Sequence, residues 1–411
     1  MNIWVVNPFD GLPGEPLRPG RYAFLTKMLA EKGHRVTWWS SNFCHTTKSF
    51  RNQGQASLEV NHNLHIILLE TPRYTKNISL RRIWNHYIYA RELEAQSGKI
   101  GESPDVVLAS SPPLWAANTA MILARKYGAK SIIDVQDVWP EAFEIAFPTQ
   151  LRPIARLFLC PLRRFADRLY DEANGITAVS HSYLHRALSA SEDGDKLNMA
   201  LPLGVNLDLY SDYLSKPVDN MPYIKQRKDE FWVLYAGTIG KMYDIRTLLE
   251  AAGRLFRSYP DMKFVIAGAG PDYADMRNYS HKMNLTNVTF TGLLSYHQFV
   301  HLLNECDIGV NPIVLTPQPC LPNKIFDYMA AGLPIINSVK GELEHLIADE
   351  RVGLHYDAGD AQSLADAIAH LYDGTQERLA MGQRARKLAQ ERFDMNKEYP
   401  KFGEFIRAMV S

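Results

Sequence analysis

The chain has 411 residues, a length that allows two or three domains. Hydrophobic residues make up 46% and charged residues 22% of the sequence, as is typical of globular proteins, and the net charge of zero excludes the strongly basic composition of many nucleic-acid-binding proteins. The charge is nevertheless uneven. Residues 1–205 carry 23 Lys and Arg against 19 Asp and Glu, a net of +4, whereas residues 206–411 carry 22 against 26, a net of −4.

Predicted strands and helices alternate along the first half of the chain. We expect strands at residues 3–7, 35–39, 64–69, 105–109, 131–135 and 175–179, and helices at 21–32, at 114–127 and from 182 onward. This alternation is typical of a doubly wound parallel sheet. Such sheets bind ligands at the loops that follow the carboxyl ends of their strands.

The second half repeats the pattern after a polar stretch at 206–229, which we interpret as a linker. Strands are expected at 231–236, 263–267, 288–290 and 308–311, and helices at 246–259, 273–283, 296–305 and from 324 onward. The sequence therefore predicts an α/β protein with one Rossmann-like domain at 1–205 and another at 230–394. A helix at about 395–411 is expected to pack back onto the first domain, and a ligand cleft is expected between the two.

The spacing of the cysteines and the length of the apolar runs indicate the cellular compartment of the protein. The four cysteines lack the CxxC spacing of zinc sites, and their scatter favours a reducing compartment such as the cytoplasm. They are Cys44, Cys160, Cys306 and Cys320. Met1 leads directly into an apolar strand and no apolar run approaches 18 residues, so we expect neither a signal peptide nor a membrane-spanning helix.

The most informative segment is residues 322–336, which we expect to form a loop, a short helix and a buried strand. Asn323 opens the predicted helix and Gly332 ends it. A helix start attracts phosphates through its unpaired N–H groups and its dipole, and Lys324 would add a full positive charge there. Asp327, one turn further on, could accept two hydrogen bonds from a ribose diol. The alternative is an ordinary helix start with a surface Lys–Asp pair.

A glycine-containing loop follows the first predicted strand, from Asp10 to Arg21. Glycines such as Gly14 would let backbone N–H groups approach a phosphate closely, and Arg18 and Arg21 add positive charge. We therefore expect this loop to face a ligand. The alternative is a loop without a binding role.

Three basic residues further along could bind a diphosphate. His45, Lys48 and Arg51 lie at positions i, i+3 and i+6, so they would share one face if the segment is helical. The same spacing is equally typical of a solvent-exposed helix face.

Two carboxylates follow the strand predicted at 131–135. Either could position a hydroxyl group of a substrate or act as its general base, and we prefer Asp137 over Glu141 for this role. The alternative is a capping role in the loop.

The Asp-Gly-Asp sequence at 193–195 lies in a polar stretch and is interpreted as a solvated turn. We expect no metal, because Lys324 and the helix dipole could neutralise a leaving diphosphate.

Two stretches have the composition of helices that lie on a membrane surface. Residues 73–91 carry five basic and no acidic residues among apolar and aromatic ones, and residues 151–169 place five arginines beside apolar side chains. Basic amphipathic helices with aromatic residues bind bilayer interfaces. The alternative is a helix that packs on the sheet while its arginine side chains reach out to solvent.

Short motifs run through the chain in a specific order. They are Pro8 with the glycine loop, Lys-Gly-His-Arg-Val at 32–36, Ala-Val-Ser at 178–180, Leu-Gly-Val-Asn at 203–206, Tyr-Ala-Gly at 235–237, Ile-Ala-Gly-Ala-Gly-Pro at 266–271, Phe-Thr-Gly at 290–292, Cys-Asp-Ile-Gly-Val at 306–310, and the segment 322–336. With these motifs the chain resembles glycosyltransferase family 4, whose members are retaining enzymes of the GT-B fold. The motifs at 110–114 and 137–141 are similar to those of N-acetylfucosamine transferases that act on undecaprenyl-diphosphate glycans in O-antigen and capsule assembly.

The resemblance implies roles for individual residues. Asp327 occupies the position of the family's ribose-binding Glu, and Pro319 that of the preceding Glu. Thr238 stands in place of an Arg, so that Lys241 or Lys324 would supply the charge. The implied nucleotide-sugar ligands are Gly14, Gly237, Thr238, Lys241, Gly268, Gly292, Leu293, Leu294, Asn323, Lys324, Ile325 and Asp327. The implied acceptor ligands are Arg18, Arg21, His45, Lys48, Arg51 and Ser111, and the implied catalytic residues are Asp137, Glu141, Lys241 and Lys324.

The resemblance also implies the reaction. We expect transfer of a sugar, with an N-acetylated deoxysugar as one candidate, from a UDP-linked donor to a lipid-diphosphate-linked glycan, with retained anomeric configuration and without a cofactor. The enzyme would work in the cytoplasm, peripherally attached to the inner membrane. Two alternatives stay open: a UDP-sugar 2-epimerase of the same architecture, and a catalytically inactive partner protein, which Pro319 suggests.

Overall fold

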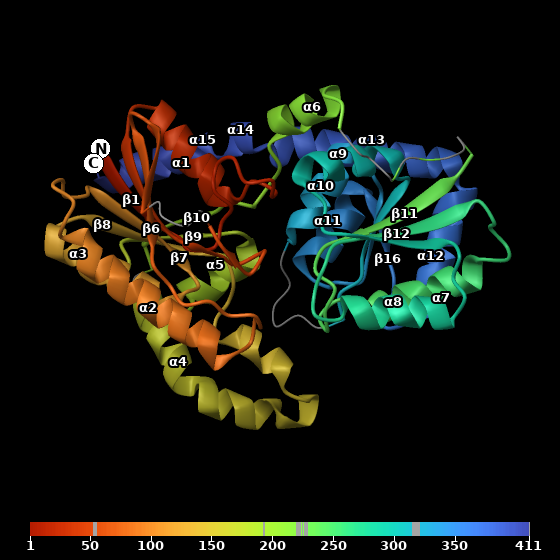
Figure 1. The fold of residues 1–411 in the computed structure, drawn as a ribbon, viewed down its shortest axis with the longest axis horizontal. Helices are drawn as coiled ribbons and strands as arrows, with labels where there is room; N and C mark the ends of the chain where they lie inside the picture. The colour runs from red at the N-terminus through yellow and green to blue at the C-terminus, as the bar shows by residue number, and fades with distance from the viewer. Residues whose placement is uncertain are drawn as a thin grey trace. The chain divides into compact units, whose positions relative to one another are not determined.

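The computed structural model describes residues 1–51, 56–191, 194–218, 223, 225, 229–314 and 321–410. The chain divides into two compact units, Met1–Pro202 with Tyr399–Ser411, and Leu203–Glu398. Each unit is an α/β structure built around one large sheet (Figure 1). The predicted fold class, with two Rossmann-like halves, is therefore confirmed.

The first unit contains an eight-stranded sheet in the order β10-β9-β8-β7-β1-β2-β6-β5. Only β5 runs antiparallel to its neighbour, β6, among these strands. The strands are β1 (Asn2–Val6), β2 (Arg35–Ser41), β5 (Ser57–Asn61), β6 (Leu64–Leu69), β7 (Val106–Ser111), β8 (Lys130–Val135), β9 (Gly175–Ala178) and β10 (Leu197–Ala200). Every residue of β7 is buried, as expected for a parallel strand covered on both faces.

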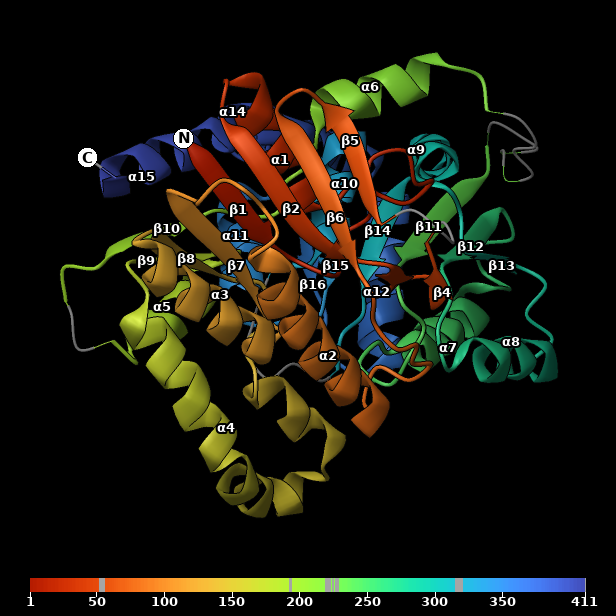
Figure 2. The same ribbon diagram turned by 60° about the vertical axis from the view of Figure 1, so that its left-hand side comes forward.

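Helices connect the strands of the first unit. They are α1 (Arg21–Glu31), α2 (Leu80–Ser97), α3 (Leu114–Tyr127), α4 (Arg152–Glu172), α5 (His181–Leu188) and α15 (Pro400–Val410), with 3-10 turns at Glu141–Ala146 and Thr149–Leu151. The basic stretches noted in the sequence correspond to α2 and α4. Helix α4 extends well beyond the edge of its own sheet (Figures 1 and 2).

One short segment differs from its predicted conformation. Residues 43–50 form a small antiparallel hairpin of β3 (Phe43–Cys44) and β4 (Ser49–Phe50). The helical face expected for His45, Lys48 and Arg51 is therefore wrong. Side-chain contacts with residues outside the segment, described below, determine where these three side chains lie.

The second unit contains a six-stranded, all-parallel sheet in the order β13-β12-β11-β14-β15-β16. The strands are β11 (Phe231–Ala236), β12 (Met262–Ala267), β13 (Val288–Gly292), β14 (Ile308–Asn311), β15 (Ile335–Asn337) and β16 (Gly353–His355). The helices are α6 (Leu207–Ser215), α7 (Ile245–Leu255), α8 (Tyr273–Lys282), α9 (Tyr296–Glu305), α10 (Asn323–Ala331), α11 (Glu342–Glu350), α12 (Ala361–Asp373), α13 (Thr375–Arg392) and α14 (Met395–Glu398).

The stretch 206–229, predicted as a linker, begins with α6 and belongs to the second unit. The side chain of Asn206 accepts a hydrogen bond from the backbone N–H of Leu209 and so caps this helix. Tyr210 of α6 is buried in the core of the unit. Most of the remaining predicted linker lies outside the described residues.

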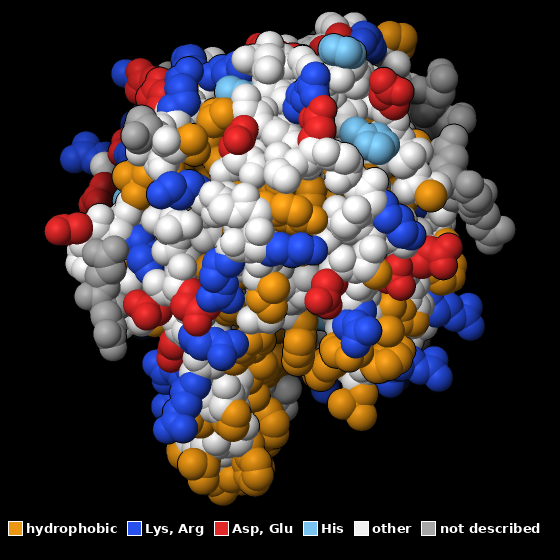
Figure 3. Space-filling view, turned by 90° about the vertical axis from the view of Figure 1, so that its left-hand side faces the viewer, with side chains coloured by type: hydrophobic (Ala, Val, Ile, Leu, Met, Phe, Trp, Pro, Cys, Tyr) orange, Lys and Arg blue, Asp and Glu red, His pale blue; other side chains and the backbone are white. Residues whose placement is uncertain are grey.

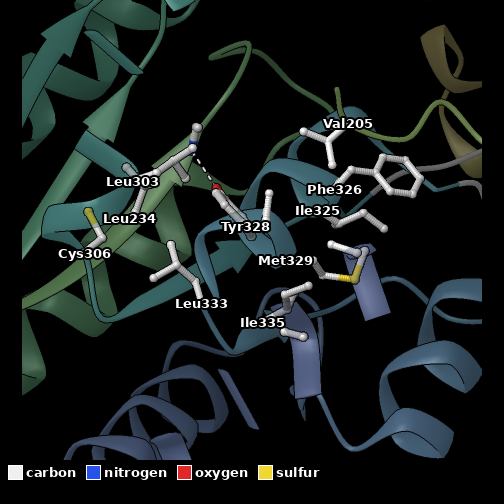
Figure 4. Packing of buried hydrophobic residues seen from close by; sticks show 14 of the residues in the cluster. Val205, Leu234, Leu303, Cys306, Ile325, Phe326, Tyr328, Met329, Leu333 and Ile335 are labelled. Atoms are coloured by element: carbon white, nitrogen blue, oxygen red, sulfur yellow. Dashed lines mark hydrogen bonds between the residues drawn. The ribbon is translucent and has the colours of Figure 1, made fainter. Parts of the chain in front are cut away.

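Helix α10 is anchored in the core of the second unit. Its apolar side chains pack with residues of the sheet and of neighbouring helices, and the Tyr328 hydroxyl accepts a hydrogen bond of 2.8 Å from the Ala236 N–H (Figure 4). Ile325 is fully buried in this cluster, and its backbone N–H already bonds Pro322. The prediction that Ile325 contacts the nucleotide is therefore wrong. Gly332 ends the helix in the left-handed conformation, with φ at 73°.

Candidate active site

The sheet order of the second unit identifies its ligand-binding edge. Strand β11 lies between β12 and β14, so the direction of strand addition reverses at the β11–β14 pair. Ligands of doubly wound sheets bind at the carboxyl ends of the strands beside such a reversal. The loop that follows β11 begins at Gly237, and helix α10 follows β14 in the chain.

Glycines at the carboxyl ends of β11, β12 and β13 link these three strand ends by backbone hydrogen bonds. The Gly237 N–H donates to Ala267 and the Gly268 N–H donates to Gly292, both at 2.9 Å. A Cβ atom on Gly268 would lie only 1.9 Å from the carbonyl oxygen of Gly237, so a side chain here would force the two loops apart. The glycines therefore permit the close approach that a backbone phosphate site needs.

Lys324 lies in the first turn of α10 and is 8% exposed. Its Nζ lies 4.3 Å from the centre of the Tyr235 ring and 4.4 Å from that of Tyr243. Among the described residues, Nζ has no hydrogen-bond partner. Burial lowers the pKa of Lys324 to about 7. A Cβ on Gly237 would come within 3.2 Å of Nζ, so the glycine leaves room beside the ammonium group.

This arrangement is suited to an anion. Aromatic faces stabilise an ammonium group only partly, and a buried cation without a counter-charge is costly. A helix N-terminus, glycine loops and a buried lysine are the groups that hold phosphates in α/β proteins. A bound diphosphate would supply the charge that Lys324 lacks, and it would raise the pKa of that lysine.

The other predicted donor ligands occupy varied places in the second unit. Thr238, Lys241, Leu293 and Asn323 are exposed, whereas Leu294 is half-buried against the core. Lys241 lines a pocket of about 200 Å³ together with residues on either side of it. The further lining residues are Ile239, Gly240, Tyr243, Asp244, Ile245, Arg246, Asp272, Met276 and Val314.

Asp327 is placed differently from the prediction. It is 1% exposed, and its carboxylate accepts a hydrogen bond of 3.0 Å from the hydroxyl group of Tyr296 on α9. The carboxylate is thus bound inside the unit rather than presented to a ribose at the surface. Pro319, in the position of the family's other Glu, lies outside the described residues, as does Asp193 of the Asp-Gly-Asp sequence.

In the first unit, two predicted acceptor ligands have structural roles instead. Arg21 is 3% exposed and donates to both oxygens of Asp134 at 2.9 Å and to the carbonyl oxygen of Leu201 at 2.6 Å. Arg51 is 7% exposed, forms an ion pair of 2.8 Å with Glu15 and donates to the carbonyl oxygen of Asp10. Both guanidinium groups therefore fasten the glycine loop and its neighbours, and the acceptor-binding role predicted for them is wrong.

Two other predicted site residues also form contacts inside the first unit. Ser111 is fully buried and its hydroxyl lies 3.4 Å from that of Tyr170. Glu141 accepts a hydrogen bond of 2.5 Å from Arg186, so this carboxylate is held in an ion pair and does not fit a general base. Arg18 is half-buried in the glycine loop. Gly14 is exposed there, with φ at 88°.

Asp137, in contrast, borders a cluster of aromatic and basic side chains. It is half-buried after β8, and burial raises its pKa to about 6 although its neighbour Arg82 opposes the shift. The Arg82 guanidinium lies over the rings of Phe9 and Trp139, at 5.6 and 5.1 Å from their centres. Arg82 also donates to Nε2 of the fully buried His86 at 3.3 Å.

His45 and Lys48 lie on the other side of Arg82. Nδ1 of His45 is hydrogen-bonded to the hydroxyl group of Tyr74, and the ammonium group of Lys48 lies 3.3 Å from the same nitrogen. Burial, together with the charge of Arg82, lowers the pKa of His45 to about 3 and that of Lys48 to about 8. His45 and Lys48 are thus brought together as predicted partners, whereas Arg51 belongs to another contact.

Five residues of these clusters were not predicted from the sequence: Arg82, His86, Tyr74, Tyr235 and Tyr243. Arg82 and His86 are four residues apart on α2, a spacing that places them on one helix face and could have been noticed. The other three depend on contacts between distant segments. Among the described residues, the structure contains no group of three or more His, Cys, Asp or Glu side chains that could hold a metal ion.

Comparisons with known proteins agree with this organisation. Residues 219–388, within the second unit, match the family profile described as Glycosyl transferases group 1. A putative colanic acid biosynthesis glycosyl transferase of Escherichia coli (strain K12), WcaI, is 23% identical over 235 residues, which cover 56% of each chain. The chain spans about half the length of the curated relatives that it matches.

Solved structures match over nearly the whole chain. Sucrose-phosphate synthase from Thermosynechococcus elongatus has a TM-score of 0.76 and 19% identity, over 99% of this chain and 98% of that protein. Anabaena HepE in complex with UDP-glucose has a TM-score of 0.68 and 16% identity, over 99% of this chain and 100% of that protein. The chain therefore has the GT-B fold, and part of its second unit is similar to group 1 glycosyl transferases.

Proposed function

We propose that this protein is a glycosyltransferase that binds a nucleotide-sugar, a UDP-sugar in the first instance, at the glycine-rich edge of its second unit. The observation that carries the proposal is Lys324. It is a buried ammonium group without a hydrogen-bond partner among the described residues, in the first turn of a helix and beside the glycine that follows β11. The match to group 1 glycosyl transferases over 219–388 supports the same activity.

The chemistry follows from the charge that develops during transfer. The bond between the anomeric carbon and the diphosphate oxygen breaks, and a new bond forms to a hydroxyl oxygen of the acceptor. The departing diphosphate gains negative charge, which Lys324 and the N–H groups of α10 would stabilise. We propose that the anomeric configuration is retained.

The acceptor hydroxyl would be bound by the first unit. Asp137 is the carboxylate best suited to receive its proton, because it is half-buried and its pKa of about 6 lies close to neutral pH. The glycosyl product keeps the acceptor oxygen, and the proton leaves through Asp137. Glu141 is excluded from this role by its ion pair with Arg186.

We further propose that the acceptor is a lipid-linked glycan at the cytoplasmic face of the inner membrane. Helix α4, the start of α2 and the residues just before each helix expose large apolar side chains. They are Ile78, Leu80, Ile83, Trp84, Leu151, Ile154, Leu157 and Phe158. Figure 3 shows apolar side chains gathered at the lower end of the view, with Lys and Arg side chains nearby. Among the described residues, no helix is long and apolar enough to cross a bilayer, so attachment would be peripheral.

The experiment is a transfer assay with UDP-linked sugars and a polyprenyl-diphosphate-linked glycan. Wild type is expected to form a lengthened glycan and UDP. Lys324→Gln is expected to lose at least a hundredfold in rate, whereas Lys340→Gln, at an exposed position of the same unit, is expected to retain it. Nucleotide binding without transfer to any acceptor, or interconversion of the free UDP-sugar, would contradict the proposed reaction.

A further inference from the structure

The first unit contains a second group of basic side chains, all half-buried, that the donor site does not explain. Lys48, Arg82 and His45 gather around the ring of Tyr74, which is 1% exposed. The Lys48 ammonium lies 4.7 Å from the centre of that ring. These side chains come from the β3–β4 hairpin and from α2, which are more than thirty residues apart in the chain.

The Lys48 and Arg82 side chains converge on one residue. Lys48 Nζ donates to the side-chain oxygen of Asn77 at 2.6 Å, and Arg82 Nη1 donates to the carbonyl oxygen of the same asparagine at 2.8 Å. Asn77 thus holds two cationic groups close together, although like charges repel each other. A bound anion would offset this repulsion.

No carboxylate of the described residues supplies that charge by an ion pair to Lys48 or Arg82. Within the described part of the chain, Asp137 is the one carboxylate that acts on either group, through its charge on Arg82. Lys and Arg side chains that lack a carboxylate partner are available to bind phosphate groups.

His45 adds a neutral donor to the same place. Its Nδ1 contacts the Lys48 ammonium, which can only donate, so Nδ1 is the acceptor and the ring proton is on Nε2. Lys48 itself is held in the left-handed backbone conformation, with φ at 57°. Non-glycine residues adopt this conformation rarely, and often at ligand sites.

The position of the group in the fold is also that of a ligand site. Phe9 follows β1, the hairpin follows β2, Tyr74 and Asn77 follow β6, and Trp139 follows β8. All of these segments leave the sheet at the carboxyl ends of parallel strands, where doubly wound sheets bind ligands.

From these contacts we infer that Lys48, Arg82 and His45 form an anion site that binds a phosphate or diphosphate group of the acceptor. Lys48 and Arg82 contact the phosphate oxygens, and the Nε2–H group of His45 donates a further hydrogen bond. The inference rests on the proposed function, since it assigns the acceptor as a phosphate ester. It also brings the phosphate group next to Asp137, the residue proposed to receive the hydroxyl proton.

The test is calorimetric titration of the full chain in the presence of saturating UDP, which occupies the proposed donor site. The probes are geranyl diphosphate, inorganic pyrophosphate and geraniol. Wild type is expected to bind geranyl diphosphate at one further site and geraniol much more weakly. Inorganic pyrophosphate distinguishes a free phosphate ligand from a lipid-linked diphosphate. An affinity for pyrophosphate comparable to that for geranyl diphosphate would show that the site recognises the phosphates alone. A weaker affinity for pyrophosphate would assign the site to a lipid-linked diphosphate.

Lys48→Gln and Arg82→Gln are each expected to weaken geranyl diphosphate binding at least tenfold while UDP affinity stays unchanged. Arg81→Gln is the matched control, because Arg81 precedes Arg82 on α2 but is exposed. Absence of a second site in wild type, equal binding of geraniol, or unchanged affinity in both variants would overturn the inference alone. Failure of UDP itself to bind would instead contradict the proposed function.

Discussion

Arg21 and Asp134 are joined by two parallel hydrogen bonds of 2.9 Å, and both side chains are 1% exposed. They link the start of α1 to the end of β8 across 113 residues of sequence. The hydroxyl groups of Tyr22 and Thr177 donate to the same carboxylate at 2.6 Å. This network holds the glycine loop and the sheet of the first unit together.

Removal of Arg21 should therefore destabilise the first unit strongly. Arg21→Ala leaves the Asp134 carboxylate buried without its main counter-charge, a loss of about 3–5 kcal/mol in the free energy of unfolding. The measurement is urea unfolding. Arg125→Ala is the control, because its ion pair with Glu172 is largely exposed and should contribute less than about 1 kcal/mol. Equal stability of the two variants would show that the network contributes little.

Nucleotide binding should depend on pH through Lys324. The free pKa of this lysine is about 7, lowered by burial, and a bound diphosphate favours the charged form. UDP affinity should therefore fall as pH rises from 7 to 9, by at most about tenfold per unit, with proton uptake on binding. Titrations in buffers of different ionisation enthalpy measure that uptake. A UDP affinity that is constant over this range would disprove the direct contact.

Lys324 should lower the free energy of unfolding when no ligand is bound. Its folded-state pKa of about 7 lies below the ordinary value of 10.5, so the unfolded chain binds more protons between those pH values. The Lys324 contribution to unfolding free energy therefore rises with pH through this window, and its cost is fully present below pH 7. Lys324→Met should stabilise the protein at pH 6 by at least about 1 kcal/mol, and by less at pH 9. A destabilised variant at pH 6 would contradict this.

Membrane attachment should depend on the apolar end of α4. Leu157 and Phe158 are 74% and 79% exposed, so their replacement by serine should leave the core intact. Wild type should sediment with anionic liposomes at low salt, and the double variant should remain in the supernatant. Ile122→Ser, at a 45% exposed position of α3, is the control and should sediment like wild type. Wild type that stays in the supernatant would favour a water-soluble acceptor.

Much of the fold was predictable because parallel sheets produce regular apolar runs. Helix α10 begins at Asn323 and ends before Gly332, as predicted, because the signals that start and stop a helix lie in the local sequence. The hairpin at 43–50 was missed because a spacing of three residues also arises by chance in a short loop. The role of Arg21 could not be predicted, because its partner, Asp134, lies on a strand far along the chain.

The candidate site was predicted only in part, for the same reason. The position of Lys324 at the start of its helix was predicted, but its burial beside Tyr235 and Tyr243 depends on contacts of α10 with β11 and with the loop that follows β11. Arg82 was counted only as one charge of a basic stretch. Its position between Phe9 and Trp139 requires three segments that the sheet brings together.

The central claim is that Lys324 binds the diphosphate of a nucleotide-sugar, and the most direct test compares UDP with uridine by calorimetry at pH 7. Wild type should bind UDP at least tenfold more tightly than uridine, because only UDP carries the diphosphate. Lys324→Gln should reduce UDP affinity to nearly that of uridine, and Lys340→Gln should leave both affinities unchanged. Equal binding of UDP to wild type and Lys324→Gln would contradict the account.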